Sequence, residues 1–337
     1  MAILTIADTQ IGPGETCEIQ IPVANLYTDT DIHMPVHVIR AKKSGPVMFV
    51  SAAVHGDELN GIEIIRRLIQ KKGFKLTAGT LILVPMVNVY GVLDQTRYLP
   101  DRRDLNRSFP GSEKGSLAGR VAYRFLNDIV KHCTHGIDLH TGAIHRSNLP
   151  QVRADLSDPE TLEMAKSFSV PVLLNSNLRD GSLRQSAVES GTKILLYEAG
   201  EALRFDEFSI RAGLDGVLKV LSHLGMVRKS KKRKMREPYI ANNSAWIRAN
   251  SSGIVRDLKG LGDQVAKGDI MAEIGNPMGR VLDHVKATRS GIIIGKQNIP
   301  LVQEGEAMFH VAYFSEDDES IAEHIENIQD RLLPDER

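Results

Sequence analysis

The chain has 337 residues, of which 42% are hydrophobic and 25% are charged, and its formal net charge is zero. The length predicts two domains of ordinary globular composition. A neutral chain has no overall electrostatic bias toward nucleic acid or membranes, and no apolar run is long enough to span a bilayer. Residues 1–11 lack the pattern of a signal peptide, and Cys17 and Cys133 do not form a disulfide or metal motif. We therefore expect a cytoplasmic protein.

Strand-like and helix-like segments alternate through the first two thirds of the chain, and this alternation indicates an α/β fold. The predicted strands are residues 36–41, 47–54, 80–87, 136–140, 170–175 and 192–198. The predicted helices are residues 61–71, 117–131, 158–168, 182–190 and 205–224. Together they predict a mixed, mainly parallel sheet flanked by helices.

Two histidines and a glutamate follow or end predicted strands. His55 and Glu58 come three residues apart after the apolar run 47–54, where Gly56 is expected to let the chain turn sharply. His140 ends another strand, and ligands of open α/β sheets bind at the carboxyl ends of strands. Two imidazoles and one carboxylate are a typical catalytic zinc set that leaves a fourth position for water. This pattern predicts one Zn²⁺ per chain.

Glu198 ends the apolar strand 192–198 and is the candidate general base. A buried carboxylate needs a partner, and water activated by zinc would provide one. Zinc lowers the pKa of its bound water toward about 7, and a carboxylate can accept the released proton. Glu201 is the nearest alternative for this role.

Residues 101–111 form a polar, arginine-rich segment without helical or strand periodicity, which predicts a functional loop. Arg107 suits the recognition of a carboxylate, because a guanidinium donates two parallel hydrogen bonds. We expect Arg102 and Arg103 to be solvated or paired with nearby acids.

Composition changes after the last predicted helix. A basic run at 228–234 lacks the interleaved aromatic residues of a nucleic-acid site, so residues 228–239 are interpreted as a solvated linker after a first domain of residues 1–227. Residues 316–337 form an acidic tail.

Residues 240–315 predict short strands with glycine-rich turns, arranged as an internal repeat. The segments 252–255 and 268–272 recur at 290–293 and 305–309. Two such halves resemble the biotinyl/lipoyl-type β-sandwich. Its central turn, residues 275–279, has no lysine to carry a prosthetic group, so we expect this domain to limit access to the active site instead.

Four motifs occur in an order that resembles the succinylglutamate desuccinylase/aspartoacylase family, a branch of the zinc carboxypeptidase-like hydrolases. They are H-G-D-E at 55–58, R-D-L-N-R-S-F-P-G at 103–111, D-L-H-T-G at 138–142 and Y-E-A-G at 197–200. The resemblance covers residues 40–225 and extends more loosely to 315. It departs at Asn88-Val89, where many relatives have Asn-Pro.

The resemblance also implies a role for each matching residue. His55, Glu58 and His140 match the zinc ligands, and Glu198 matches the general base. The remaining matches are Asn106 and Arg107 for holding a substrate carboxylate, Arg97 for polarising the scissile carbonyl, and Arg184 for a second carboxylate contact.

These features predict a zinc-dependent amidohydrolase that cleaves an N-acyl amino acid or a similar small, carboxylate-bearing amide. A zinc carboxypeptidase acting on peptides is the alternative, since both share their chemistry. A non-enzymatic or nucleic-acid-binding protein is disfavoured by the intact ligand set. We expect a small-molecule substrate, no nucleic-acid or membrane partner, and leave a homo-oligomer open.

Overall fold

The computed structural model describes residues 3–228 and 238–313. Most of the predicted linker at 228–239 and the predicted acidic tail at 316–337 lie outside these residues. No helix in the described part of the chain is long and apolar enough to cross a membrane.

A mixed sheet of 13 strands organises the molecule, and most of its strands follow one path in the order β12-β19-β17-β8-β10-β7-β5-β6-β4-β3. These strands are β12 (Asn243–Arg248), β19 (Ala307–Tyr313), β17 (Gly291–Gln297), β8 (Arg146–Ala154), β10 (Lys193–Glu201), β7 (His135–Gly142), β5 (Val47–Ala52), β6 (Thr80–Val84), β4 (Asp31–Arg40) and β3 (Thr16–Asn25). Off this path lie β9 (Val172–Asn175), β11 (Tyr239–Ala241) and β14 (Gln264–Val265). A separate hairpin joins β1 (Leu4–Ile6) to β2 (Thr9–Ile11).

The centre of the sheet is parallel, because β6, β5, β7 and β10 pair in parallel with one another. These strands are buried on both faces, which explains their nearly continuous apolar runs. Antiparallel strands extend the sheet on both sides. The predicted fold class, a mixed sheet flanked by helices, is confirmed.

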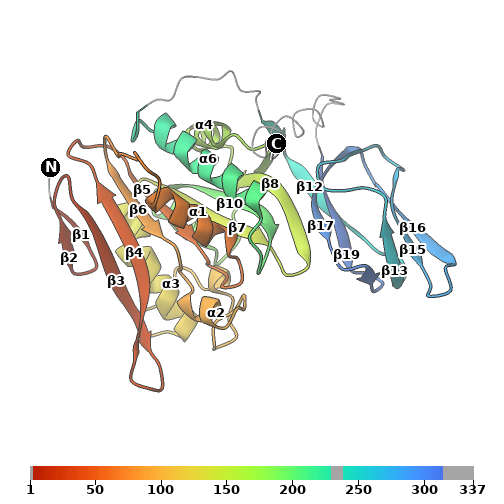
Figure 1. Cartoon of the computed structure of the whole chain (residues 1–337), viewed down its shortest axis with the longest axis horizontal. Helices are drawn as coiled ribbons and strands as arrows, with labels where there is room; N and C mark the ends of the chain where they lie inside the picture. Colours follow the sequence, from red (N-terminus) through yellow and green to blue (C-terminus); the bar gives the residue numbers. More distant parts are fainter. Residues whose placement is uncertain (1–2, 229–237, 314–337) are drawn as a thin grey trace.

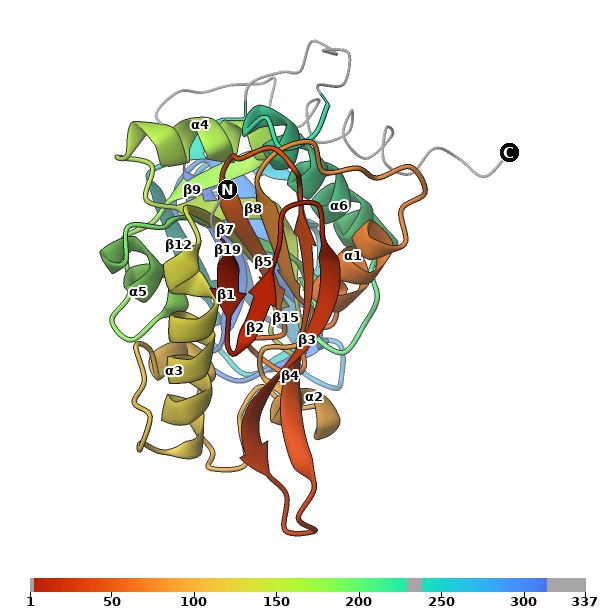
Figure 2. The ribbon, with the colours of Figure 1, turned by 90° about the vertical axis from the view of Figure 1, so that its left-hand side faces the viewer.

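Helices cover both faces of the sheet (Figure 2). On one face lie α1 (Asn60–Ile69), α4 (Pro159–Phe168) and α6 (Glu207–His223), and on the other lie α3 (Leu117–Asp128) and α5 (Leu183–Glu189). Short turns of helix complete this part of the chain: α2 (Val89–Leu93), η1 (Leu105–Arg107) and η2 (Val130–His132).

The helices begin where side chains can cap them. Asp158 accepts a hydrogen bond from the backbone N–H of Thr161 at the start of α4, and Asp206 accepts one from Ser209 at the start of α6. Each cap satisfies one of the backbone donors that have no partner within the helix. Phe168 then stacks on Tyr197 of β10 with ring centroids 5.0 Å apart, which fixes α4 against the sheet.

The C-terminal strands continue the same sheet and are covered by a second one. β17 pairs with β8, so the large sheet extends from the helical region into the C-terminal unit (Figure 1). A four-stranded antiparallel sheet shares an apolar core with β12, β17 and β19. Its strands are β16 (Val281–Lys286), β15 (Ile270–Gly275), β13 (Gly253–Asp257) and β18 (Leu301–Val302). This arrangement confirms the predicted β-rich C-terminal region, whereas its exact boundaries stay a prediction.

Candidate metal and catalytic site

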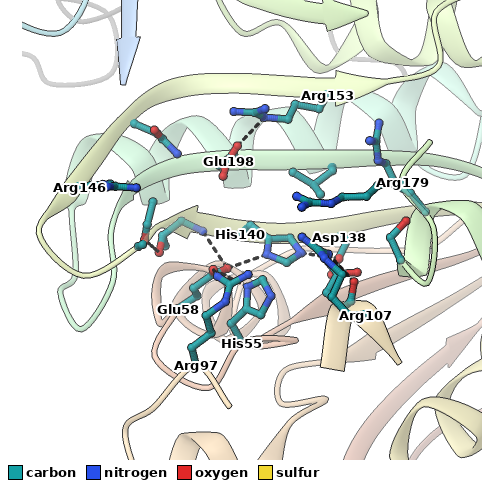
Figure 3. Close-up of a pocket in the computed structure, with 18 of the residues that line it drawn as sticks. His55, Glu58, Arg97, Arg107, Asp138, His140, Arg146, Arg153, Arg179 and Glu198 are labelled. Atoms are coloured by element: carbon teal, nitrogen blue, oxygen red, sulfur yellow. Dashed lines mark hydrogen bonds and ion pairs between the residues drawn. The ribbon is translucent and has the colours of Figure 1, made fainter. Parts of the chain in front are cut away.

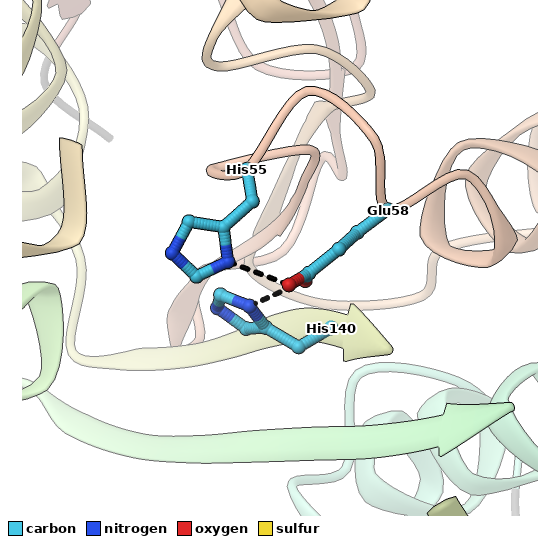
Figure 4. Close-up of side chains that lie close together, drawn as sticks. All are labelled: His55, Glu58 and His140. Atoms are coloured by element: carbon cyan, nitrogen blue, oxygen red, sulfur yellow. Dashed lines mark hydrogen bonds and ion pairs between the residues drawn. The ribbon is translucent and has the colours of Figure 1, made fainter. Parts of the chain in front are cut away.

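Three buried side chains form the centre of the site. His55 follows β5, Glu58 precedes α1, and His140 lies in β7. Nδ1 of His55 lies 2.6 Å from one carboxylate oxygen of Glu58, and Nδ1 of His140 lies 2.7 Å from the other (Figure 4). One ligand atom from each residue lies within 4.8 Å of the others. Burial raises the pKa of Glu58, but the two imidazoles outweigh it and hold that pKa below its ordinary value.

The outer nitrogens of both imidazoles have carboxylate partners. Nε2 of His140 lies 2.6 Å from Asp138, whose other oxygen accepts a hydrogen bond from the Ser51 hydroxyl at 2.7 Å. Nε2 of His55 lies 3.2 Å from Asp104. Carboxylates in this position orient metal-binding imidazoles and increase their basicity. The donor set therefore fits a zinc ion held by the two Nδ1 atoms and the Glu58 carboxylate.

Sequence reasoning missed the roles of Asp138 and Asp104. Asp138 stands two residues before His140 on a strand, where alternate side chains share a face, so its spacing could have revealed it. Asp104 reaches His55 across 49 positions of the chain, and no local pattern indicates that contact.

Gly56 is needed for a different reason from the one predicted. The positive φ in this segment belongs to Ala53, at 52°, whereas Gly56 lies against the backbone of Gly91 in α2. A Cβ atom on Gly56 would lie 1.9 Å from the Gly91 carbonyl carbon. The chain does turn at Gly56, where the backbone N–H of Glu58 donates to the carbonyl of His55, but the close approach of two backbones is what requires a glycine there.

Arg97 lies beside the cluster. It contacts Asp104 at 2.9 Å through Nη2, and its Nη1 lies 3.6 Å from Glu58. It follows α2, whose N-cap residue Asn88 accepts a hydrogen bond from Gly91. Many relatives have Asn-Pro where this chain has Asn88-Val89. The turn is intact here, because Val89 occupies the first helical position, where proline is equally suited.

Glu198 stands next to His140 in the register of β10 and β7. Its carboxylate lies 2.6 Å from the guanidinium of Arg153 on β8. Beyond it the register shifts at a bulge that contains Gly200 at φ 73°. Glu201, the alternative base, instead accepts hydrogen bonds from the backbone of His145 and, in the C-terminal unit, from the side chain of Asn298.

The predicted substrate-binding residues lie on neighbouring segments. The side-chain oxygen of Asn106 accepts a hydrogen bond from the backbone of Leu183 at 2.9 Å, which leaves its Nδ2 as a donor. Arg107 donates to the backbone carbonyl of Asn106, and burial lowers its pKa. Arg184 is buried and donates to the carbonyl of Asn177 at 3.0 Å, so it also supports the loop that follows β9.

One pocket of about 290 Å³ brings the predicted residues together (Figure 3). The predicted residues that line it are His55, Glu58, Arg97, Asn106, Arg107, His140, Arg184 and Glu198. Other residues that line it carried no sequence signal, and among them are Arg146, Arg153, Arg179 and Trp246. Trp246 belongs to β12, so the C-terminal unit supplies part of the wall.

The model of the succinylglutamate desuccinylase/aspartoacylase catalytic domain matches residues 44–224. This chain belongs to the succinylglutamate desuccinylase/aspartoacylase family. Membership confirms the resemblance carried by the four motifs and places the protein among hydrolases that act on amide bonds.

Individual relatives extend the similarity beyond the matched domain. The N-alpha-acetyl-L-2,4-diaminobutyric acid deacetylase of Halomonas elongata is 26% identical over 295 residues, which cover 83% of this chain and 86% of that protein.

Solved structures share the fold over most of their length. The product-bound ectoine utilization protein EutE of Ruegeria pomeroyi has a TM-score of 0.80 at 22% identity, covering 93% of this chain and 99% of that one. The succinylglutamate desuccinylase/aspartoacylase of Rhodobacter sphaeroides has a TM-score of 0.75 at 23% identity, covering 90% and 96%.

Proposed function

We propose that this protein is a zinc-dependent deacylase that hydrolyses the amide bond of an N-acyl amino acid or a similar small amide bearing a carboxylate. The observation that carries the proposal is the convergence of His55, Glu58 and His140 with Glu198 and Arg107 around one pocket. The named activity of the Halomonas deacetylase supports an amide of an amino acid as the substrate.

The chain's own side chains would divide the chemistry as follows. A zinc ion at the cluster would supply Lewis-acid polarisation and a water molecule activated at neutral pH. Glu198 accepts the proton of the attacking water and returns it to the nitrogen of the leaving amine. Arg153 holds the carboxylate of Glu198 at the pocket. Arg97, fixed by Asp104, places a positive charge where the carbonyl oxygen becomes negative.

We expect the carboxylate of the substrate to bind beside the reaction centre, where Arg107, Asn106 and Arg184 line the pocket. Arg107 lines the pocket, and in the described residues it donates only to a backbone carbonyl, so a substrate anion would be its charged partner. The free Nδ2 of Asn106 adds a second donor, and Arg184, which also lines the pocket, adds a third. A cavity of about 290 Å³ suits a small amide better than a long peptide.

A substrate panel tests this proposal directly. N-acetyl, N-succinyl and N-formyl amino acids are assayed beside peptides, with added zinc, in the wild type, in Glu198→Gln and in the control Glu201→Gln. We expect hydrolysis of an N-acyl amino acid, loss of at least about 100-fold in kcat in Glu198→Gln, and retained zinc. Glu201→Gln should lose much less, because Glu201 does not line the pocket.

The other outcomes contradict the proposal in distinguishable ways. Hydrolysis of peptides alone would make the protein a carboxypeptidase. Near-normal turnover by Glu198→Gln would remove the assigned base.

A further inference from the structure

The pocket has a second positively charged end that the proposed chemistry does not use. In Figure 3, Arg146 lies on one side of the His140–Glu58 centre, and Arg107 and Arg179 lie on the opposite side. Arg146 begins β8 and lines the pocket. Its guanidinium carbon lies 5.2 Å from the centre of the Trp246 ring.

Arg146 has no carboxylate partner among the described residues, and in this it resembles Arg107 at the opposite side of the pocket. Arg97 contacts Asp104, and Arg153 contacts Glu198. A guanidinium that lies over an aromatic ring keeps the N–H groups at its edge available for a planar anion. The described contacts of Arg146 therefore leave room for a carboxylate from a ligand.

A row of paired residues across four strands connects Trp246 with the strand of Arg146. Trp246 pairs with His310, His310 with Gly295, and Gly295 with Asn148 of β8. A Cβ atom on Gly295 would lie 3.5 Å from Cη2 of Trp246 and 2.8 Å from Oδ1 of Asn148. The missing side chain at Gly295 thus lets Asn148 approach from β8 and lets His310, on which the indole stacks, approach from β19, where a Cβ atom would lie 3.0 Å from Cβ of His310.

His310 supports the indole from the sheet. The two rings stack 4.8 Å apart at an interplanar angle of 11°, and Nε2 of His310 lies 2.9 Å from the hydroxyl of Ser244. Burial and the nearby Arg153 lower the pKa of His310 to about 3. The imidazole is therefore neutral at physiological pH and adds no charge that would repel Arg146.

We propose that Arg146, held over Trp246, binds a carboxylate carried by the acyl part of the substrate. This inference rests on the proposed deacylase function. In an N-acyl amino acid, the amino acid provides the nitrogen of the scissile bond. Its carboxylate and its side chain therefore both lie on the amine side of that bond. If Arg107 binds that carboxylate, the acyl group extends to the opposite side of the centre, where Arg146 lies. The substrate class is then a monoamide of a dicarboxylic acid.

Two acyl groups of equal length test the assignment. N-succinyl and N-butyryl derivatives of one amino acid differ at the far end of the acyl chain, which is a carboxylate in the first and a methyl group in the second. We expect the wild type to prefer the succinyl derivative. In Arg146→Gln the ratio of the two kcat/KM values should fall at least about tenfold, mainly through KM, because a charged hydrogen bond is lost. Arg146→Lys should recover part of the ratio.

Further variants separate this role from a structural one. Arg289→Gln is the matched control, because Arg289 lies 5.7 Å over the ring of Tyr313 in the same unit but does not line the pocket. Its ratio should equal that of the wild type. Gly295→Ala and Trp246→Leu should lower the ratio in the same direction as Arg146→Gln, whereas Trp246→Phe keeps a ring beneath the guanidinium and should lower it less.

Two results would overturn the inference. The first is an unchanged ratio in Arg146→Gln, including one that comes from an equal loss for both acyl groups. The second concerns the amine part of the substrate. If Arg146→Gln changes the preference between N-acetylaspartate and N-acetylasparagine, and not the preference between the two acyl groups, then the carboxylate bound by Arg146 lies on the amine side of the scissile bond. Absence of turnover for every N-acyl amino acid contradicts the proposed function itself, whereas turnover with an unchanged ratio contradicts the Arg146 assignment alone.

Discussion

Arg103 and Arg107 lie in one loop but have different surroundings. Both side chains are exposed, but Arg107 lines the pocket, whereas Arg103 does not line it and lies 3.9 Å from Asp101. The sequence supported this distinction only through the family motif, because both residues stand in the same polar run. The folded loop places Arg107 at the pocket, where a substrate can reach it, and Arg103 beside Asp101.

Substitution of these two arginines by alanine should therefore have unequal effects. Arg107→Ala is expected to weaken transition-state binding by about 2–5 kcal/mol, the cost of removing one partner of a charge pair that the bound substrate would bury. Arg103→Ala should change it by less than about 1 kcal/mol, as expected for an exposed pair. The measurement is kcat/KM for one carboxylate-bearing substrate, and equal losses would show that the loop is wrongly assigned.

Asp138 should act on the metal through His140. Asp138→Asn keeps the shape of the side chain but removes the charge that lies 2.6 Å from Nε2 of His140. We expect zinc affinity to fall about 10–100-fold, the usual cost of losing such a partner. Competition with a chelator measures the affinity, and a value equal to that of the wild type would contradict this role.

At the scale of elements, the predicted central strands and helices agree with the structure because their apolar runs and periodicity are strong. The strand β8 was missed, since some of its buried residues, such as Asn148 and Gln151, are polar and since Pro150 interrupts the pattern. Its arginines, Arg146 and Arg153, were therefore missed as pocket residues. The strand β3 was also missed, although its alternating burial is visible in the sequence.

The contact between the His55–Glu58 segment and α2 is a feature of elements rather than of single side chains. Gly56→Ala would place a methyl group against the backbone of Gly91, so we expect a loss of about 1–3 kcal/mol in the free energy of unfolding. Zinc affinity should fall with it, because His55 and Glu58 flank the displaced residue. Gly260→Ala is the control, since the nearest atom to its Cβ lies at 3.9 Å. Denaturant unfolding of both variants measures the difference, and equal stabilities would contradict the close approach.

At the scale of the whole molecule, the C-terminal unit is part of the same sheet as the catalytic region. The pairing of β17 with β8 and the place of Trp246 in the pocket make this unit part of the pocket wall, whereas its limiting of access stays a prediction. The internal repeat indicated the strands of this unit. It could not indicate that one of them would join β8, because that pairing connects segments more than 140 positions apart.

Removal of the C-terminal unit should expose the edge of β8 and the apolar side chains beneath it. A chain ending at residue 228 loses the cover that Ile292 and Ile294 give to Leu149. We expect this truncated chain to aggregate, because an unpaired strand edge promotes association. Co-expression of residues 238–337 should restore solubility. A soluble, monomeric truncation with the substrate preference of the full chain would contradict this view of the molecule.

The central claim is that His55, Glu58 and His140 hold one zinc ion per chain. Elemental analysis of the purified wild type, of His140→Ala and of His284→Ala tests it most directly. His284 is exposed in the C-terminal unit and is therefore a matched control. We predict one zinc per chain in the wild type and in His284→Ala, and a large loss in His140→Ala. Equal zinc content in the wild type and in His140→Ala would contradict the claim.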